Sequence, residues 1–328
     1  MRVFVFGAGA SKPAGLPLGR DLYGSLRAYI LKRSGEDDGY SDVACRLKDL
    51  EQQGVLGNSD DFELDLTRLD VRIKSKDAPP LFRSVRQELA DTLTDHFNAL
   101  QNEIATVTAR LSYLEGFAQT HTHEGDAIIT FNYDCLFERV LHGLGLWTIE
   151  DGYGFQRTLT NSSLDQPEAR SPCKVLKLHG SVGWISSVIN FDFFIQEEPL
   201  AFVGYPKTRD SAYKKFGGQR ATILQSYVKV LTAYPLPQLW REAAERLRRA
   251  SEITIIGYSM PAADSAAWTL FLTNTPREIP VYYFWTGNEA GLGNLKRLTR
   301  LFKSISINLQ VRKATIEQLT HVSDFSTI

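Results

Sequence analysis

Four stretches of the sequence combine a short apolar run with glycine, histidine or small polar residues at its end. They lie at residues 3–11, 127–134, 175–181 and 253–259. Near-continuous apolar runs of this length predict buried strands of a parallel sheet. Ligands bind beyond the carboxyl ends of such strands, so we expect the four polar endings to line one crevice.

The first stretch ends in Gly7, Gly9 and Ser11, between a predicted strand and a predicted helix. A turn at this place directs backbone N–H groups outward, and small residues let phosphate oxygens approach them. The dehydrogenase fingerprint needs glycine where Lys12 stands, and the Gly-Lys-Ser/Thr of a P-loop is absent. The residues therefore predict either a phosphate-binding turn of another kind or a tight strand-to-helix connection in which glycine supplies a positive φ.

Asn132 and Asp134 stand just beyond the second predicted strand. On a common face, an amide and a carboxylate could hold a ribose or orient a water molecule. Asp134 could equally cap the helix that follows.

His179 follows the third predicted strand, next to Gly180. An imidazole exchanges protons near neutral pH, so His179 could act on a hydroxyl group, with a structural role as the alternative. His121 and His123 have i,i+2 spacing in a predicted loop, which is a poor arrangement for binding a metal. We therefore predict no metal site.

The fourth stretch places Gly257 and Ser259 between a strand and a helix, where they could make a second nucleotide contact. Ser259 or Asp264 could instead cap that helix. Asn288, beyond a later apolar run, could meet a ribose or adenine or merely close a turn.

The alternation of apolar runs with helical patterns predicts the fold class: α/β, with a doubly wound, mostly parallel Rossmann-like sheet and a helical insertion. We expect one domain over residues 1–328, with a helix over 18–32 and an irregular polar connection over 34–60. Apolar residues at every third or fourth position predict the helical insertion at about 62–120. Residues 183–237 form a variable segment without a clear pattern.

Composition excludes several classes of protein. The 37 basic and 38 acidic residues leave a net charge of −1, so overall charge favours neither nucleic acid nor a membrane surface. Three scattered cysteines argue against a disulfide framework or a structural zinc site. No apolar run is long enough to cross a bilayer, and the first residues lack a signal-peptide pattern. We expect a soluble, cytoplasmic protein without direct nucleic-acid binding.

Taken in order, the four stretches resemble the NAD site of the sirtuin superfamily. The opening pattern of that family corresponds here to Gly7, Ala8, Gly9, Ser11, Gly15, Leu16, Pro17 and Arg20. Its Thr-Gln-Asn-x-Asp pattern corresponds to Thr130, Phe131, Asn132 and Asp134. Its Leu-His-Gly and Gly-Thr-Ser patterns correspond to Leu178, His179, Gly180, Gly257, Tyr258 and Ser259.

The chain departs from the sirtuin deacylases at three places. No cysteine lies between Gly180 and Gly257, so the zinc module of that family is missing. Leu18 and Gly19 replace an Asp-Phe pair whose Phe guards the nicotinamide site, and Phe131 replaces a glutamine. With these traits the chain resembles the bacterial sirtuin-like NAD hydrolases of antiphage defence.

That resemblance implies hydrolysis of NAD⁺ to nicotinamide and ADP-ribose, with NAD⁺ as substrate and with neither zinc nor a prosthetic group. It implies catalytic roles for Asn132, His179 and Asp134. The expected NAD contacts are Gly7, Ala8, Gly9, Ser11, Pro17, Arg20, Thr130, Gly257, Ser259 and Asn288. The resemblance further implies a homo-oligomer that depletes NAD⁺ in antiphage defence, in some cases beside an ATPase, helicase-like or Argonaute partner.

Three other functions stay open at this point. One is an interaction subunit whose helical insertion, residues 62–120, docks a helicase-like or nuclease partner. A protein deacylase or ADP-ribosyltransferase could use the same NAD site, although the missing zinc module disfavours it. A non-catalytic subunit could instead sense NAD or ADP-ribose and gate a partner, and it would show tight binding without turnover.

Overall fold

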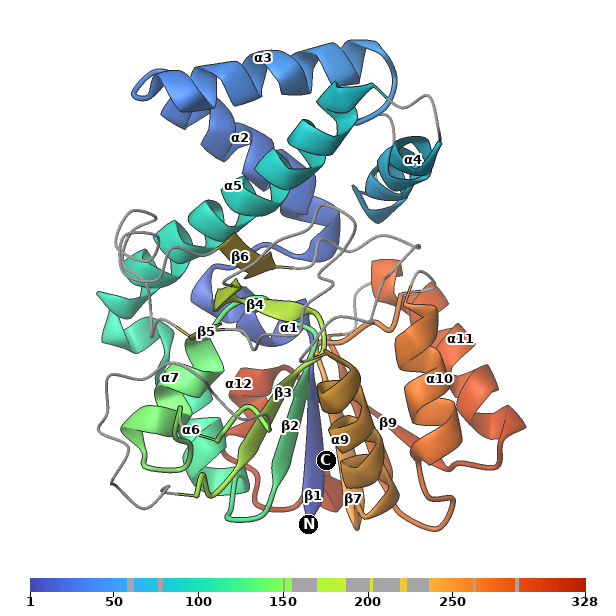
Figure 1. Ribbon diagram of the computed structural model, residues 1–328. Helices are drawn as coiled ribbons and strands as arrows, with labels where there is room; N and C mark the ends of the chain where they lie inside the picture. Colours follow the sequence, from blue (N-terminus) through green and yellow to red (C-terminus); the bar gives the residue numbers. More distant parts are fainter. Residues whose placement is uncertain are drawn as a thin grey trace.

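The computed structural model of the chain describes residues 1–57, 62–75, 79–149, 151–154, 170–186, 201–202, 219–222, 236–261, 264–286 and 289–328. Figure 1 shows a central sheet with helices beside it and a further group of helices beyond one end of its strands.

The sheet has six parallel strands in the order β3-β2-β1-β7-β8-β9. They are β1 (Arg2–Phe6), β2 (Ala127–Thr130), β3 (Lys174–Lys177), β7 (Glu252–Ile256), β8 (Val281–Trp285) and β9 (Leu309–Lys313). The inner strands are almost fully buried, as their near-continuous apolar sequences require, whereas the edge strand β9 is half-buried. The predicted α/β class with a mostly parallel, Rossmann-like sheet is confirmed.

The strand order reverses between β1 and β7. From β1 the chain builds β2 and β3 on one side and then returns to place β7 on the other side. Val5 of β1 accordingly pairs with Ile129 of β2 and with Ile255 of β7. Loops that leave neighbouring strands in opposite directions open a crevice, and doubly wound sheets bind their ligands there.

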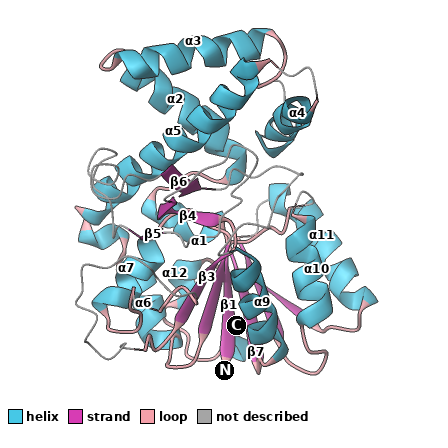
Figure 2. Cartoon of the chain, in the orientation of Figure 1, coloured by secondary structure: helices cyan, strands magenta, loops and turns pink. Residues whose placement is uncertain are grey.

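Helices flank the strands, as Figure 2 shows by its colouring. The helix α6 (Ser112–His121) packs against α7 (Leu136–Gly143) and α12 (Ile316–Leu319). The helix α9 (Leu236–Arg248) packs against β3 and α10 (Ser265–Asn274), and α11 (Glu289–Ser304) packs against β9. A short 3-10 turn, η4 (Phe325–Thr327), ends the chain.

A second group of helices lies between β1 and β2 in the sequence and beyond the carboxyl ends of the strands in space (Figure 1). It contains α1 (Ala8–Ser11), η1 (Lys12–Ala14), η2 (Gly19–Asp21), α2 (Leu22–Ser34), α3 (Asp38–Gln52), α4 (Phe62–Lys74), α5 (Pro80–Ala105) and η3 (Thr108–Arg110). The helix expected over 18–32 is α2, four residues later at its start. That residues 62–120 form a separate insertion stays a prediction.

The expectation of an irregular connection over 34–60 is wrong, because α3 occupies most of this range. Asp37 caps α3 by accepting a hydrogen bond of 2.8 Å from the backbone N–H of Gly39. Tyr40, Leu47 and Leu50 are buried on one face of the helix. Asp38, Gly39 and Asp42, which are among the residues that suggested a loop, therefore belong to the start of an amphipathic helix.

A small antiparallel sheet has the order β5-β4-β6, with β4 (Gly180–Ser186), β5 (Ala201–Phe202) and β6 (Gln219–Thr222). These strands fall mainly within the variable segment predicted at 183–237. Residues 187–200, 203–218 and 223–235 of that segment lie outside the described residues.

Candidate functional site

The loops that follow β1, β2, β3 and β7 lie at one edge of the sheet. The backbone N–H of Gly7 donates to the carbonyl of Ile256 at 3.2 Å, and that of Phe131 donates to the carbonyl of Phe6 at 3.1 Å. The strand-to-strand hydrogen bonds thus continue into the loops. The four polar endings chosen from the sequence therefore share one edge, as parallel pairing requires.

The glycines of the first loop are explained by close packing against the loop after β7. A Cβ atom on Gly7 would lie 2.5 Å from the Cα of Tyr258, and one on Gly9 would lie 2.7 Å from the Cα of Gly257. Gly257 itself has a φ of +65°. Only glycine fits such an approach of two backbones. The packing supports the tight-connection interpretation, and a phosphate contact at Gly7 and Gly9 stays a prediction.

Ser11, Asn132 and Asp134 form one hydrogen-bonded cluster, which links the loops after β1 and β2. The hydroxyl of Ser11 donates to Oδ2 of Asp134 at 3.0 Å and accepts from Nδ2 of Asn132 at 3.1 Å. The same Nδ2 donates to the carbonyl of Gly7 at 3.1 Å. Ser11 and Asp134 are each only 5% exposed, so this Ser11–Asn132–Asp134 cluster is a buried polar network.

The amide oxygen of Asn132 is buried, and no described residue donates a hydrogen bond to it. A cavity of about 10 Å³ lies beside the cluster, bordered by Ser11, Thr130, Asn132 and Asp134. Such a volume is about that of one water molecule. The cavity can therefore hold water against the cluster, but it is far too small for a nucleotide.

Asp134 also contacts the start of the helix that follows, although Cys135 and not Asp134 occupies the N-cap position of α7. Its Oδ1 accepts from the backbone N–H of Leu136, the first residue of α7, at 3.1 Å. One carboxylate oxygen thus faces the helix and the other faces Ser11. The hydrogen bond to the first residue of α7 is observed, and a catalytic role for Asp134 stays a prediction.

A buried ion pair between Lys177 and Glu138 contacts the loop that carries Asp134. Nζ of Lys177, at the end of β3, lies 2.8 Å from Oε1 of Glu138 and also donates to the backbone carbonyl of Asp134. The side chains of Lys177 and Glu138 are 0% and 3% exposed. Burial raises the pKa of Glu138, and Lys177 offsets part of that rise. Burial, the largest single effect, would lower the pKa of Lys177, but the neighbouring Glu138, Cys135 and Asp134 together outweigh it and the pKa is raised.

His179 is buried against a carboxylate that the sequence did not indicate. Its Nε2 lies 3.3 Å from Oδ2 of Asp264, and the side chains are 1% and 0% exposed. The hydroxyl of Tyr258 donates to the same Oδ2 at 2.5 Å. Burial, followed by the charge of Asp264, holds the pKa of Tyr258 well above its usual value, so this hydroxyl keeps its proton.

Asp264 does stand at the N-cap position of α10, as one interpretation held, but its side chain makes no capping hydrogen bond. The sequence shows only that Asp264 stands at the start of a predicted helix. It does not indicate that this carboxylate faces His179, which is distant in the chain. Phe131 completes the surroundings, with its ring stacked on Tyr258 at 4.0 Å and edge-on to His179 at 4.9 Å.

The other described residues predicted to contact NAD lie outside the Ser11–Asn132–Asp134 cluster. Arg20 is exposed in η2 and pairs with Asp21 at 3.7 Å, and Ser259 is exposed beyond β7. Pro17 is half-buried between η1 and η2. Ala8 begins α1, and Thr130 accepts at Oγ1 from the backbone of Asn132 at 3.1 Å. Asn288 lies outside the described residues.

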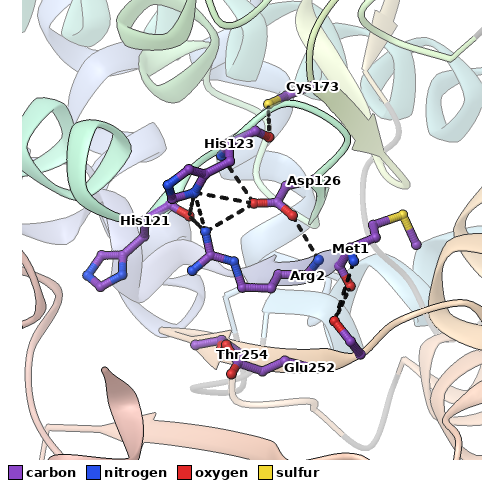
Figure 3. Close-up of polar contacts among 9 residues, drawn as sticks. Met1, Arg2, His121, His123, Asp126, Cys173, Glu252 and Thr254 are labelled. Carbon is purple, nitrogen blue, oxygen red and sulfur yellow. Dashed lines mark hydrogen bonds and ion pairs between the residues drawn. The ribbon is translucent and has the colours of Figure 1, made fainter. Parts of the chain in front are cut away.

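The histidine pair of residues 121 and 123 belongs to a different cluster, at the amino ends of the strands (Figure 3). There Arg2 pairs with Asp126 at 3.3 Å and contacts His123, while Sγ of Cys173 donates to the carbonyl of His123 at 3.0 Å. Burial raises the pKa of the Cys173 thiol to about 12. These groups tie the starts of β1, β2 and β3 together at the end of the sheet opposite the candidate site.

No group of three or more His, Cys, Asp or Glu side chains in the part of the chain that the structure describes could hold a metal ion. No helix there is both long enough and apolar enough to span a membrane.

The described residues thus form a Rossmann-type α/β protein whose carboxyl edge carries the Ser11–Asn132–Asp134 cluster and a buried His179–Asp264 pair. Residues 126–264 match the family model described as the SIR2-like domain. The match covers less than half of the chain, and it contains Asn132, Asp134, His179 and Asp264.

Among solved structures, the chain is similar to a Sir2 homologue in complex with NAD, at 14% identity and a TM-score of 0.42 over 93% of this chain and 90% of that chain. It is similar to a mutant Sir2 homologue in complex with ADP-ribose, at 14% identity and a TM-score of 0.41 over 94% of each chain. It is also similar to Sir2Tm bound to a propionylated peptide, at 14% identity and a TM-score of 0.40 over 98% of this chain and 90% of that chain. No curated protein matches the chain.

Proposed function

We propose that the protein hydrolyses NAD⁺ to nicotinamide, ADP-ribose and a proton. The observation that carries the proposal is the Ser11–Asn132–Asp134 cluster at the carboxyl ends of β1 and β2, with His179 beyond the adjacent β3. Most of these residues lie in the segment that matches the SIR2-like domain.

The chemistry suits such a set of side chains. The bond between nicotinamide and ribose is a glycosidic bond with a cationic leaving group, so no acid is needed to protonate that group, unlike in ordinary glycosides. The site has to stabilise an oxocarbenium-like transition state and to activate water. Asp134 supplies negative charge near the developing cation, Asn132 orients the ribose or the water, and His179 accepts the proton of the water.

The remaining residues are assigned by the same proposal. Ser11 and the backbone around it, Gly7, Ala8 and Gly9, face the pyrophosphate. Pro17, Arg20 and Thr130 lie on the nicotinamide side, and Gly257, Ser259 and Asn288 on the adenosine side. Leu18 and Gly19, in the place of a guarding aromatic residue, admit water to the reacting carbon.

The biological role in the proposal is NAD⁺ depletion in the cytoplasm of a bacterium during antiphage defence. The protein acts as a homo-oligomer, with or without an ATPase, helicase-like or Argonaute partner. The missing zinc module, Leu18 and Gly19 in place of Asp-Phe, and Phe131 in place of glutamine resemble antiphage NAD hydrolases and support this part.

The test is to incubate the purified full chain with NAD⁺ and to quantify nicotinamide, ADP-ribose and cyclic products, with and without an acylated peptide. We expect release of nicotinamide and ADP-ribose without the peptide, and a loss of about 10²-fold or more in Asn132→Ala and in His179→Ala. Asn274→Ala, which changes the last residue of α10, bonded there to Arg248 at the end of α9, serves as the matched control.

The outcomes separate the alternatives. Nicotinamide release that requires the acylated peptide would assign a deacylase instead. NAD⁺ binding without any product, in every preparation, would assign a sensor. Wild-type rates in both site variants would remove Asn132 and His179 from the reaction.

A further inference from the structure

We propose that Asp264 is the positioning residue of His179: its carboxylate holds the Nε2–H of the imidazole and so makes Nδ1 the nitrogen that accepts the proton of the attacking water. The inference rests on the proposed function, because it assigns a role to the histidine of that same site.

The side chains of His179 and Asp264 are isolated from solvent. His179 and Asp264 have exposed side-chain fractions of 1% and 0%, and 3.3 Å separates Nε2 from Oδ2. A buried carboxylate is stable only where polar partners surround it, and here the hydroxyl of Tyr258 donates to Oδ2 while Nε2 of His179 lies within ion-pair distance of it. The pair is therefore a specific contact of the interior and differs from the weak ion pairs of a protein surface.

The second step concerns Met260 and Pro261, which precede Asp264 in the chain. Met260 has a φ of +47°, a backbone conformation that non-glycine residues adopt only where their surroundings enforce it. Its carbonyl accepts a hydrogen bond from Arg297 of α11. The carbonyl of Pro261 accepts from the indole N–H of Trp268 and from the backbone N–H of Asp264, each at 3.0 Å. Met260 is thus held by α11, and Pro261 by α10.

The third step is the position of His179 itself. It stands between β3 and β4, next to Gly180, which has a φ of +76°. The edge of Phe131 covers one side of the ring. A side chain held between an aromatic ring and a fixed carboxylate has little freedom to rotate.

The consequence concerns the tautomer. A neutral imidazole carries its proton on one nitrogen and accepts with the other. Because Nε2 faces an acceptor-only carboxylate, the proton resides there and Nδ1 is the basic nitrogen. In serine proteases a buried aspartate sets the tautomer of the catalytic histidine in the same manner, and its replacement by asparagine lowers turnover about 10⁴-fold.

The direct test is nitrogen NMR of the full chain with ¹⁵N-labelled histidine, at neutral pH and without NAD⁺. The chain has six histidines, and the signal of His179 is the one lost in His179→Gln or the one left when the other five are assigned by substitution. We expect a proton on Nε2 and a bare Nδ1. A proton on Nδ1, in the neutral or the charged ring, would overturn the proposal.

The kinetic test is Asp264→Asn. The new amide can accept from Tyr258 and present its NH₂ to Nε2, which moves the imidazole proton to Nδ1. We expect kcat for NAD⁺ cleavage to fall at least about 10²-fold, with KM changed less than about threefold. Unchanged kcat in a folded Asp264→Asn variant would overturn the proposal.

The matched control is Asp95→Asn. Asp95 is also a buried carboxylate that accepts from a tyrosine, here Tyr40 at 2.7 Å, but it lies on α5 and bonds to α3. We expect its kcat to equal that of the wild type. If Asp264→Asn does not fold, as judged by thermal unfolding, the nitrogen NMR spectrum of the wild type still shows which nitrogen of His179 carries the proton. If the wild type cleaves no NAD⁺, the proposed function fails, and the spectrum separately decides whether Asp264 sets the tautomer.

Discussion

Ser11 and Asp134, which are 123 positions apart in the sequence, are joined by a hydrogen bond of 3.0 Å between buried side chains. The serine ends α1, directly after β1, and the aspartate lies just before α7, after β2. Because β1 and β2 are parallel neighbours in register, their carboxyl ends bring the two loops into contact. With Asn132, the pair forms the polar centre of the candidate site.

Replacing Ser11 by alanine removes a donor to Asp134 and an acceptor for Asn132. We expect the free energy of unfolding to fall by about 1–3 kcal/mol, since buried polar groups lose their partner, and nicotinamide release to fall as well. Urea unfolding and product quantification measure the two effects. Ser84→Ala, which removes only a local hydrogen bond to Leu81 within α5, should leave both nearly unchanged.

Replacing Gly9 by alanine forces a Cβ to within 2.7 Å of the Cα of Gly257. Backbone cannot move aside as a flexible side chain can, so we expect a loss of about 1–3 kcal/mol or more in the free energy of unfolding. Thermal unfolding checks this. Gly24→Ala, where no atom lies within 4 Å, should be neutral or stabilising, because alanine favours the helix α2. Equal stability of the two variants would contradict the close packing of the loops.

Replacing Lys177 by methionine leaves Glu138 buried without its cation. Loss of one member of such a pair costs about 3–5 kcal/mol. The loss should grow with pH: the pKa of Glu138 is already raised by burial, and without Lys177 it rises further. Because the pKa of Glu138 is higher in the folded state than in the unfolded state, its contribution to stability is fully present below the unfolded pKa of about 4.3. This contribution declines as the pH rises through the folded pKa.

Urea unfolding at several pH values measures this slope in the Lys177→Met variant. The double variant with Glu138→Gln should lose the slope. Arg46→Met, which breaks a partly exposed pair with Glu88, should cost less than about 1 kcal/mol. A Lys177→Met curve parallel to that of the wild type would contradict the assignment.

We expect His96 to make the free energy of unfolding decrease at acidic pH. It lies on α5, its Nε2 contacts the hydroxyl of Ser25 at 2.7 Å, and burial lowers its pKa to about 4. A histidine with a lowered folded pKa contributes stability above its unfolded value of about 6.5 and loses it as pH falls toward the folded value. We therefore expect the stability of the wild type to decline between about pH 6.5 and 4.

The His96→Gln variant should show a smaller decline over that range in thermal unfolding followed at several pH values. The exposed His321, changed to glutamine in the same way, provides the control. The same decline in all three proteins would show that His96 is not responsible.

The sequence supported the α/β class because each inner strand is a short apolar run followed by glycine or a polar residue. It also identified Ser11, Asn132, Asp134 and His179 as candidate site residues, since these types stand at strand ends. The expectation of an irregular connection over 34–60 was wrong. The apolar positions of α3 are separated by charged residues, so its buried face is not apparent in the sequence.

What the sequence determined by itself is therefore local: strands, most helices, and the residue types placed at the end of each strand. Only the tertiary structure decided which of those ends touch. Gly9 meets Gly257, Ser11 meets Asp134, and Asp264 turns from its helix toward His179. Periodicity and capping preferences act over a few neighbouring residues, whereas the order of strands in a sheet is set by the packing of the whole chain, so contacts between distant loops leave no pattern in the sequence.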